Sequence, residues 1–287
     1  VAALGGSSAN ISAALARQGM KAALLTRVSD DAVGRYCLNQ LDHYGIDRTH
    51  VKPISGEWRN SLALAETRIK DHQSVIYRNG AADFQMDFAD VEAVDYGRYG
   101  ALITTGTVLA AEPSRSAAFR AFELARTAGV ALVFDVDYRP YSWPSAQVAA
   151  DTYSHAAALC DIIVGNDEEF GLMAVGYDKG LAKARSLLAA QAQIVVYKMG
   201  AKGAITMTRD TELATGIYLT QALKPTGAGD SFMGGLMAGL ADGRTLRESV
   251  LRGSASAAMV VSRVGCAPAM PTTAELDAFL ATQSEPV

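Results

Sequence analysis

The segment Thr226-Gly227-Ala228-Gly229-Asp230 has the residue types that most directly suggest chemistry. It precedes a helical run over residues 231–240, so the first backbone amides of that helix would carry the positive end of its dipole. Small residues let an anion approach such amides, and Asp230 would lie where a substrate hydroxyl and a terminal phosphate could meet. An ordinary glycine turn with an aspartate that complements the dipole has the same pattern. Both interpretations are open.

A second polar group, Asn166-Asp167-Glu168-Glu169, directly follows the apolar run 162–164. Asn166 and Glu169 have the spacing of a capping box, in which each side chain bonds the backbone of the other residue. Alternatively, their oxygens could hold magnesium through its water molecules, because this ion keeps much of its hydration. The spacing favours capping over metal binding.

Two arginines also stand in distinctive surroundings, Arg78 in VIYRNGAAD and Arg139 in FDVDYRPYSW. The planar guanidinium group is suited to a carboxylate or a phosphate, although an ordinary surface ion pair explains either residue equally well. Arg139 follows the carboxyl end of an expected strand, where open α/β sheets bind ligands. These two side chains are candidates for recognising an acidic ligand.

Glycines occur in two further segments, Lys198-Met199-Gly200-Ala201-Lys202-Gly203 and Gly5-Gly6-Ser7-Ser8-Ala9-Asn10. In the first, glycines after a strand permit a tight turn, with or without a ligand beside it. The second opens a helix and could be a loop with an N-cap only. The Walker A pattern GxxxxGK[ST] does not occur, so the sequence does not predict an ordinary P-loop fold.

The elements that must position these residues alternate between strand and helix. The expected strands are residues 21–28, 102–105, 130–136, 161–164 and 194–197. The expected helices are 8–18, 31–44, 114–128 (with Ser114 as N-cap and Gly129 as C-cap), 166–173, 179–190, 228–240, 245–261 and 273–280. This alternation predicts a parallel sheet covered on both faces.

Residues 61–66 and 74–78 break that rhythm, since they alternate in polarity around Lys70-Asp71-His72. They predict a β-hairpin, which could be a lid over a site or a surface excursion. Because the sequence has no repeat and no Pro/Gly-rich linker, a single domain is the simplest organisation.

Composition excludes several classes of protein. The 287 residues are 49% hydrophobic and 20% charged, as in ordinary globular domains. A net charge of −4 without a basic block excludes an electrostatic footprint for nucleic acid. No apolar run approaches the roughly 18 residues that span a bilayer, and the start lacks the pattern of a signal peptide. The three cysteines and four histidines are scattered, so neither a disulfide framework nor a zinc site is indicated. We expect a cytoplasmic protein.

Taken in order, GGSSAN, N-x-x-E, the post-strand G-x-x-G and GAGD resemble the ribokinase-like (PfkB) carbohydrate kinases over nearly the whole chain. The resemblance implies a three-layer Rossmann-like α/β fold with a mostly parallel central sheet and a small β lid. It implies a single kinase domain over 1–287 with a lid hairpin at about 59–80, without the strand that usually opens the family. Within the family, the segments YRNGAAD, GTVLAAEPSR, FDVDYRPYSWPS and VVSRVGCAPAMPT look most like kinases of carboxylate-bearing, deoxygenated keto-sugars.

The resemblance further implies that Asp230 is the general base, and that the amides of Gly227, Ala228 and Gly229 form an anion hole for the transferring phosphoryl group. ATP and Mg²⁺ are the implied cofactors. Asn166 and Glu169 would hold the ion through its water molecules. The residues implied at the nucleotide are Asn166, Glu169, Lys198, Gly200, Gly203 and, near the adenine, Ser254.

For the sugar acid, the resemblance implies that Gly6 and Asn10 hold hydroxyl groups and that Arg78 and Arg139 bind the acid end. Neither nucleic acid nor a membrane is an expected partner, and a homodimer and a monovalent cation are left open. Lys224-Pro225 stands where the family usually has Asp-Thr, at the loop that would hold such a cation. Another sugar kinase, or a binding module without catalysis, is the alternative.

Overall fold

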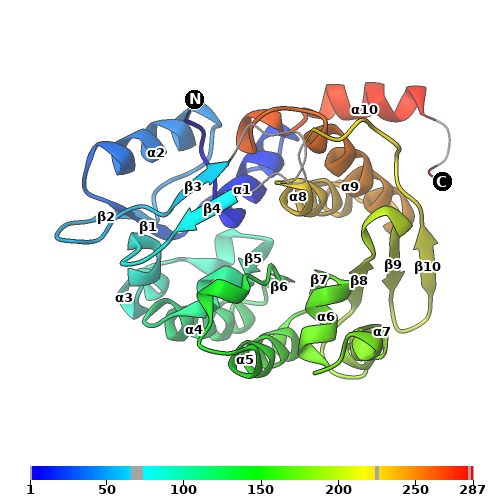
Figure 1. The fold of residues 1–287 in the computed structure, drawn as a ribbon, viewed down its shortest axis with the longest axis horizontal. Coiled ribbons are helices and arrows are strands. Elements are labelled where there is room, and N and C mark those ends of the chain that lie inside the picture. Colours follow the sequence, from blue (N-terminus) through cyan, green and yellow to red (C-terminus); the bar gives the residue numbers. More distant parts are fainter. Residues whose placement is uncertain (1, 66–73, 224–225, 284–285, 287) are drawn as a thin grey trace. The chain divides into compact units, whose positions relative to one another are not determined.

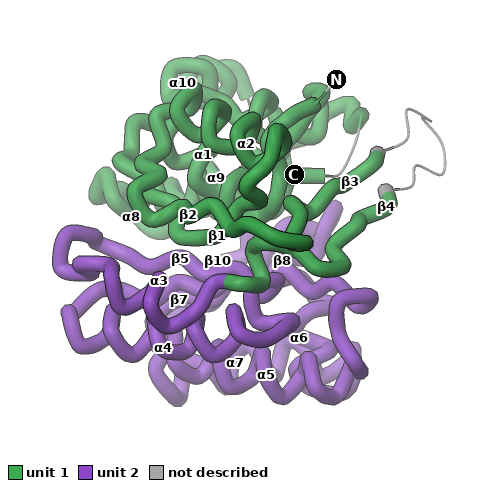
Figure 2. Tube along the Cα trace, turned by 90° about the vertical axis from the view of Figure 1, so that its left-hand side faces the viewer, with its two compact units in different colours: residues 1–85, 217–287 green, residues 86–216 purple. Residues whose placement is uncertain are grey.

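A computed structural model of the protein describes residues 2–65, 74–223, 226–283 and 286 (Figure 1). Contacts within the chain divide it into two compact units (Figure 2): unit 1 comprises residues 1–85 and 217–287, and unit 2 comprises residues 86–216. Unit 1 is therefore formed by the two ends of the sequence and unit 2 by its middle. The single kinase domain expected over 1–287 stays a prediction.

Unit 2 is built on a six-stranded sheet with the order β10-β9-β8-β7-β6-β5. Its strands are β5 (Ala101–Thr105), β6 (Ala131–Asp135), β7 (Ile162–Asn166), β8 (Ile194–Lys198), β9 (Ala204–Met207) and β10 (Glu212–Thr215). The first four are parallel and β9 and β10 are antiparallel. Side chains of β6 that point to opposite faces, such as Val133 and Phe134, are equally buried, as predicted from its continuous apolar run.

Helices join the parallel strands of unit 2. They are α4 (Ser114–Thr127), α5 (Ala146–Leu159), α6 (Asp167–Met173) and α7 (Gly180–Leu187), while the short α3 (Phe88–Glu92) precedes β5. Because β5 to β8 follow one another in space as in sequence, right-handed crossovers place the connecting helices on the same face of the sheet. Figure 1 shows α4 to α7 along that face.

Unit 1 has mainly helices and two small sheets. Its helices are α1 (Ser7–Arg17), α2 (Ala32–His43), α8 (Ala228–Ala241), α9 (Leu246–Val261) and α10 (Thr273–Thr282). Parallel β1 (Thr26–Ser29) and β2 (Val51–Ile54) form one sheet, and antiparallel β3 (Leu62–Ala65) and β4 (Ser74–Tyr77) the other. The most deeply buried members of the core around α1 are Ala13, Ala14, Val260, Ala267 and Met270. None of the described helices combines the length and apolarity that crossing a bilayer demands.

Two predictions for unit 1 can be compared directly. The hairpin strands form as β3 and β4, while the predicted turn at Lys70-Asp71-His72 lies outside the described residues. The strand predicted over 21–28 is wrong in its first half, where Ala23 makes only an isolated bridge to Asp47. The reason is a turn after Asp47, whose carboxylate accepts from the Thr49 amide at 2.8 Å and interrupts the pairing before β2.

In unit 2, the predicted N-cap role of Ser114 is wrong. The α4 helix follows Pro113, and Ser114 lies inside its first turn, where its Oγ donates to Val108 O at 2.7 Å. Gly129 follows the helix end with φ +74°, as the expected C-terminal glycine. The 14-residue α5 helix and the β9–β10 pair were not predicted from the sequence.

Candidate functional site

The first helical turn of α8 begins at Gly227, which adopts φ +88° and ψ −2°. This left-handed conformation favours glycine, and a Cβ would meet Val260 and Cys266 only at ordinary contact distances of 3.4–3.5 Å. Conformation rather than space therefore explains the glycine. Among the described residues, no side chain caps this helix start, which is the arrangement that suits an anion.

Asp230 lies in that first turn and accepts a hydrogen bond from Asn10 Nδ2 at 2.8 Å. Asn10 is 4% exposed on α1. Its backbone N–H donates to Gly6 O at 2.9 Å, and Gly6 itself has φ +92°, so the glycine sets the start of α1. Two motifs that lie 220 positions apart in the sequence thus meet within unit 1.

Small residues allow this meeting (Figure 1). A Cβ placed on Gly234 would lie 2.4 Å from the Cβ of Ala14, so α1 and α8 touch at backbone distance. On the α9 side, a Cβ on Gly235 would lie 2.9 Å from Gly253 Cα, and one on Gly253 would lie 2.8 Å from Phe232 O. The glycines of α8 therefore bring the helix between two close neighbours and fix the position of its first turn.

Ser254, expected near the adenine, lies half-buried on α9. Two residues further on, Ser256 Oγ and Ser231 Oγ form a buried hydrogen bond of 2.7 Å between α9 and α8. This bond adds a polar link to the glycine-mediated packing of the same helices. The role expected for Ser254 stays a prediction.

Arg78, just after β4, forms an ion pair with Asp83. Its guanidinium also lies over the ring of Phe84, with Cζ 4.0 Å from the ring centroid. Asp83 accepts a further hydrogen bond from Ser61 Oγ at 2.8 Å. The structure thus contains an ion pair at Arg78, one of the two explanations that the sequence left open, and this pair fixes the orientation of the guanidinium group.

In unit 2, Asn166 and Glu169 form the predicted capping box. Asn166 Oδ1 accepts from the Glu169 amide at 2.9 Å, and Glu169 Oε2 accepts from the Asn166 amide at 2.7 Å. The other carboxylate oxygen of Glu169 accepts from the Tyr138 amide at 3.1 Å. Glu169 therefore ties the start of α6 to the segment that follows β6. The capping interpretation is confirmed.

Burial raises the pKa of Glu169, which is only 6% exposed. The positive charge of Lys198 and the backbone hydrogen bonds act in the opposite direction, and the nearby Asp137 adds to the increase. Lys198 ends β8 in register with Asn166 at the end of β7, so its charge is placed by strand pairing. A cation and a buried carboxylate accordingly share the carboxyl edge of this sheet.

The donor set can be compared with what magnesium requires. Among the described residues, no group of three His, Cys, Asp or Glu side chains could hold a metal ion. Asn166 Oδ1 and both Glu169 oxygens accept from backbone amides, so direct coordination would compete with the start of α6. Since each such oxygen has two lone pairs, the residues fit an ion held through its own water molecules.

The two glycines after β8 have different explanations. Gly203 has φ +81°, and a Cβ there would lie 2.0 Å from Thr215 O, so the approach of the β10 end requires glycine. Gly200 has φ +56°, and a Cβ there would meet nothing within 4 Å. Packing therefore accounts for Gly203 without a ligand, and only conformation accounts for Gly200.

Arg139 follows β6 and pairs with Asp137, with its Nη2 2.6 Å from Oδ1. Asp137 is buried and adopts φ +39°, which is uncommon for a residue other than glycine. Strained backbone of this kind is concentrated at functional sites. Asp137 was not singled out from the sequence, although the spacing D-Y-R placed it two residues before the predicted arginine.

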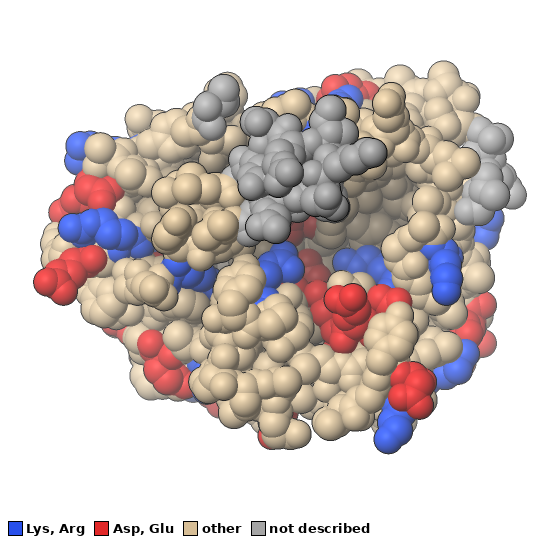
Figure 3. Space-filling model, in the orientation of Figure 1, with Lys and Arg blue, Asp and Glu red and all other residues tan. Residues whose placement is uncertain are grey.

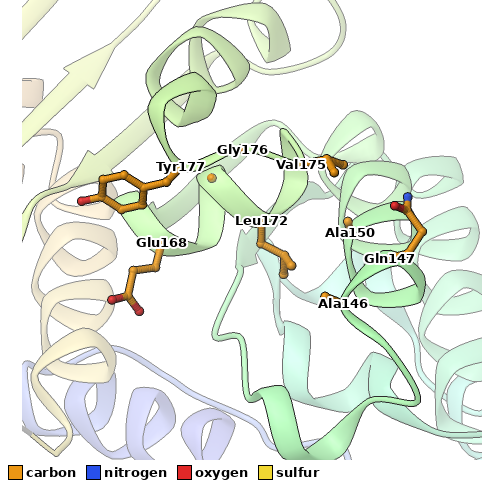
Figure 4. Close-up of a pocket in the computed structure, with 9 residues that line it drawn as sticks. Ala146, Gln147, Ala150, Glu168, Leu172, Val175, Gly176 and Tyr177 are labelled. Atoms are coloured by element: carbon orange, nitrogen blue, oxygen red, sulfur yellow. The ribbon is translucent and has the colours of Figure 1, made fainter.

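A shallow groove of about 350 Å³ lies between α5 and α6 (Figure 4), lined by Gln147, Glu168, Leu172 and Tyr177 among others. Tyr177 Oη donates to Asp167 Oδ2 at 2.5 Å. None of the predicted site residues lines this groove. Acidic side chains gather over α6 on the face shown in Figure 3, and the first turn of α6 carries Asp167 and Glu168.

Comparison with known proteins gives consistent matches. The model of the pfkB family carbohydrate kinases matches residues 1–273. The chain is 39% identical over 285 residues to 5-dehydro-2-deoxygluconokinase of Geobacillus thermodenitrificans (strain NG80-2), covering 96% of this chain and 84% of that relative.

Solved structures of sugar kinases and of a PfkB protein have the same fold as this chain. Fructokinase from Vibrio cholerae O395, bound to fructose, ADP and calcium ion, has a TM-score of 0.84 and 25% identity, covering 96% of this chain and 91% of that one. The PfkB protein from Polaromonas sp. JS666 has a TM-score of 0.83 and 28% identity, covering 96% and 89%. The predicted ribokinase-like α/β fold with a mostly parallel central sheet is confirmed.

Proposed function

The chain belongs to the pfkB family of carbohydrate kinases, and we propose that it transfers the γ-phosphoryl group of ATP to the terminal hydroxyl of 5-dehydro-2-deoxygluconate. The observation that carries the chemistry is Asp230 in the first turn of α8, which no described side chain caps, with Asn10 donating a hydrogen bond to its carboxylate. The sugar acid is proposed because the relative from Geobacillus thermodenitrificans bears that name and matches almost the whole chain. The bound fructose and ADP of the Vibrio cholerae neighbour support a sugar and an adenine nucleotide as ligands.

In the proposed reaction, the substrate hydroxyl oxygen forms a bond to the γ-phosphorus while the bond from that phosphorus to the bridging oxygen of ADP breaks. Asp230 accepts the hydroxyl proton, and the amides of Gly227, Ala228 and Gly229 stabilise the charge on the phosphoryl oxygens. A carboxylate at a helix N-terminus is a weak base. It suffices because the transition state of phosphoryl transfer is loose and the proton leaves late.

Unit 2 is proposed to handle the nucleotide phosphates. Magnesium, when bound, neutralises phosphate charge. Asn166 and Glu169 would hold it through water, since their oxygens already accept from backbone amides. The acidic first turn of α6 would repel a bare triphosphate, which supports a requirement for the metal. Lys198 would contribute a positive charge of its own, with Gly200 and Gly203 at the nucleotide and Ser254 at the adenine.

Arg78 and Arg139 are proposed to bind the carboxylate of the substrate. Each guanidinium is oriented by a protein carboxylate, Asp83 and Asp137 respectively. An arginine has five N–H donors in a fixed plane, so a pairing through one edge is compatible with a ligand at another. The cytoplasmic location and the homodimer remain predictions. The monovalent cation also remains a prediction, because Lys224-Pro225, at the loop that would hold it, lies outside the described residues.

A coupled ADP-release assay over a panel of sugars tests the proposal. We expect the highest kcat/KM for 5-dehydro-2-deoxygluconate, with 2-keto-3-deoxygluconate as the nearest competitor. Equal turnover of ribose, adenosine and fructose, with none for the keto-deoxy acids, would refute the substrate. Ligand-dependent thermal stabilisation without ADP formation would instead indicate a binding module.

Replacement of Asp230 tests its proposed role as the base, and the melting temperature of the variant serves as the control for folding. Asp230→Asn keeps the size of the side chain and should lower kcat by about 10²–10⁴-fold, the usual loss for a positioned base. The melting temperature of the variant, measured by circular dichroism, should stay close to that of the wild type. A kcat within twofold of the wild type would remove Asp230 from the mechanism.

A further inference from the structure

The helix start at Gly227 packs against the connection between α9 and α10, residues 262–272. A Cβ on Gly227 would lie 3.5 Å from both Cβ and Sγ of Cys266, which belongs to this connection. Val260, near the end of α9, would lie 3.4 Å from the same position. The α9–α10 connection therefore backs the first residue of the proposed anion hole, and its conformation bears on where the Gly227 amide points.

One arginine ties the connection together. Arg263 Nη1 donates to Ala269 O at 3.3 Å, and Arg263 Nη2 lies 3.0 Å from Glu275 Oε1 on α10. Cys266 lies between Arg263 and Ala269 in the sequence, and its carbonyl accepts from the Ala269 amide at 2.9 Å. Arg263 thus closes the loop that contains Cys266 and attaches this loop to the next helix.

The carboxylate that pairs with Arg263 is itself fixed. Glu275 Oε2 accepts from the Thr272 amide at 2.8 Å and from Thr272 Oγ1 at 3.0 Å, in the capping box that starts α10. The other oxygen, Oε1, is the one that faces Arg263. Because one oxygen is held at the helix start, the second is presented to the guanidinium in a defined orientation.

We propose that Arg263, held by Glu275, is a positioning residue for phosphoryl transfer, which sets the start of α8 through the contact of Cys266 with Gly227. This inference rests on the proposed kinase function. Donors that stabilise charge in a transition state must be aimed before the reaction occurs. A misplacement of about 1 Å can cost a large factor in rate. Loss of Arg263 should therefore weaken transition-state stabilisation more than the binding of the nucleotide.

Replacement of the arginine tests the first half of the inference. Arg263→Met removes both polar contacts and keeps an unbranched apolar side chain, and it should lower kcat for the proposed substrate by about tenfold. The KM values for ATP and for the sugar acid should stay within twofold of the wild type. Arg17→Met is the matched control, because Arg17 Nη2 lies 3.6 Å from Glu275 Oε2 and does not belong to the connection. This control should leave kcat within twofold.

A binding measurement separates positioning from general loss of structure. ADP with magnesium and aluminium fluoride mimics the transferring phosphoryl group, and its affinity in the presence of the sugar acid can be measured by titration calorimetry. In Arg263→Met this affinity should fall by about tenfold, while the affinity for magnesium and ADP alone stays unchanged. Equal changes in the two affinities would refute the positioning role.

Glu275→Gln provides a milder variant if Arg263→Met does not fold. Glutamine can replace glutamate in a capping box, so α10 keeps its start while the charge that holds Arg263 is lost. We expect kcat to fall by about threefold with an unchanged melting temperature. An unchanged kcat in this variant, or in Arg263→Met, would refute the inference while leaving the kinase function intact. A wild-type enzyme without turnover on any sugar of the panel would refute the proposed function first, and the inference with it.

Discussion

Gly234→Ala should destabilise the protein through the contact between α1 and α8. The new Cβ would lie 2.4 Å from that of Ala14, although ordinary van der Waals contact begins at 3.4 Å. The obstructing atom is fixed to the backbone, so the helices must separate. Retreat toward α9 is blocked, because Cβ atoms on Gly235 and Gly239 would already lie 2.9 Å from that helix.

The magnitude follows from two opposing effects. Overpacking costs about 1–3 kcal/mol, while alanine is favoured over glycine in a helix by about 1 kcal/mol. We therefore expect a net loss of about 1–2 kcal/mol in the free energy of unfolding. Urea denaturation should show a lower midpoint with an unchanged m-value, as for a change in stability alone. The kcat should fall as well, because the Asn10–Asp230 hydrogen bond lies one turn away.

The double variant Ala14→Gly with Gly234→Ala is the matched test. It moves one methyl group across the same gap and exchanges the two helix propensities, so the stability should return to within about 0.5 kcal/mol of the wild type. Should Gly234→Ala be as stable as the wild type, or the double variant be less stable than Gly234→Ala, the proposed helix contact would be wrong.

Two further predictions concern unit 2. Arg139→Lys should raise KM for acid substrates and leave that for neutral sugars unchanged, because an ammonium group cannot replace the planar fork; equal KM values for the acids in steady-state assays would make Arg139 structural. Burial raises the pKa of Asp161, but hydrogen bonds from Gln191, Leu132 N and Arg126 outweigh it, and the net pKa is lowered from 3.8. A lowered folded-state pKa contributes stability that is present above the unfolded value and is lost as the pH falls through the folded one. Asp161→Asn should therefore lower stability at neutral pH and flatten the loss below pH 3.8 in acid denaturation curves, and parallel curves for variant and wild type would contradict this.

Elements with strong local signals were predictable from the sequence. The buried runs that became β6, β7 and β8 are continuous in apolar residues, and the capping box at Asn166 depends on two residues three positions apart. In contrast, α5 buries mostly alanines, including Ala149 and Ala156, whose weak hydrophobic periodicity gives little signal. Its N-cap Ser145, which accepts from the Val148 amide, was the available clue.

The strands β9 and β10 were harder to predict than the β3–β4 hairpin, because their existence depends on partners in the sheet. Only four residues form β9 and four form β10, and each is held by its neighbour in the sheet. The Ser114 error has a similar origin. A serine before a helical run has the composition of an N-cap, but here its hydroxyl donates to carbonyl groups that the 3-10 turn before α4 presents.

In the candidate site, glycines that match the family motif are required for different physical reasons. Both glycines of the post-strand G-x-x-G match the family pattern, yet at Gly203 the Thr215 carbonyl alone forbids a side chain. At Gly227 the space is open enough for a Cβ, and the left-handed backbone at the start of α8 is what requires glycine. A motif position therefore points to a ligand only where packing leaves the residue type unexplained. By that criterion the start of α8, with its Asn10–Asp230 hydrogen bond, is a stronger candidate for ligand binding than Gly203.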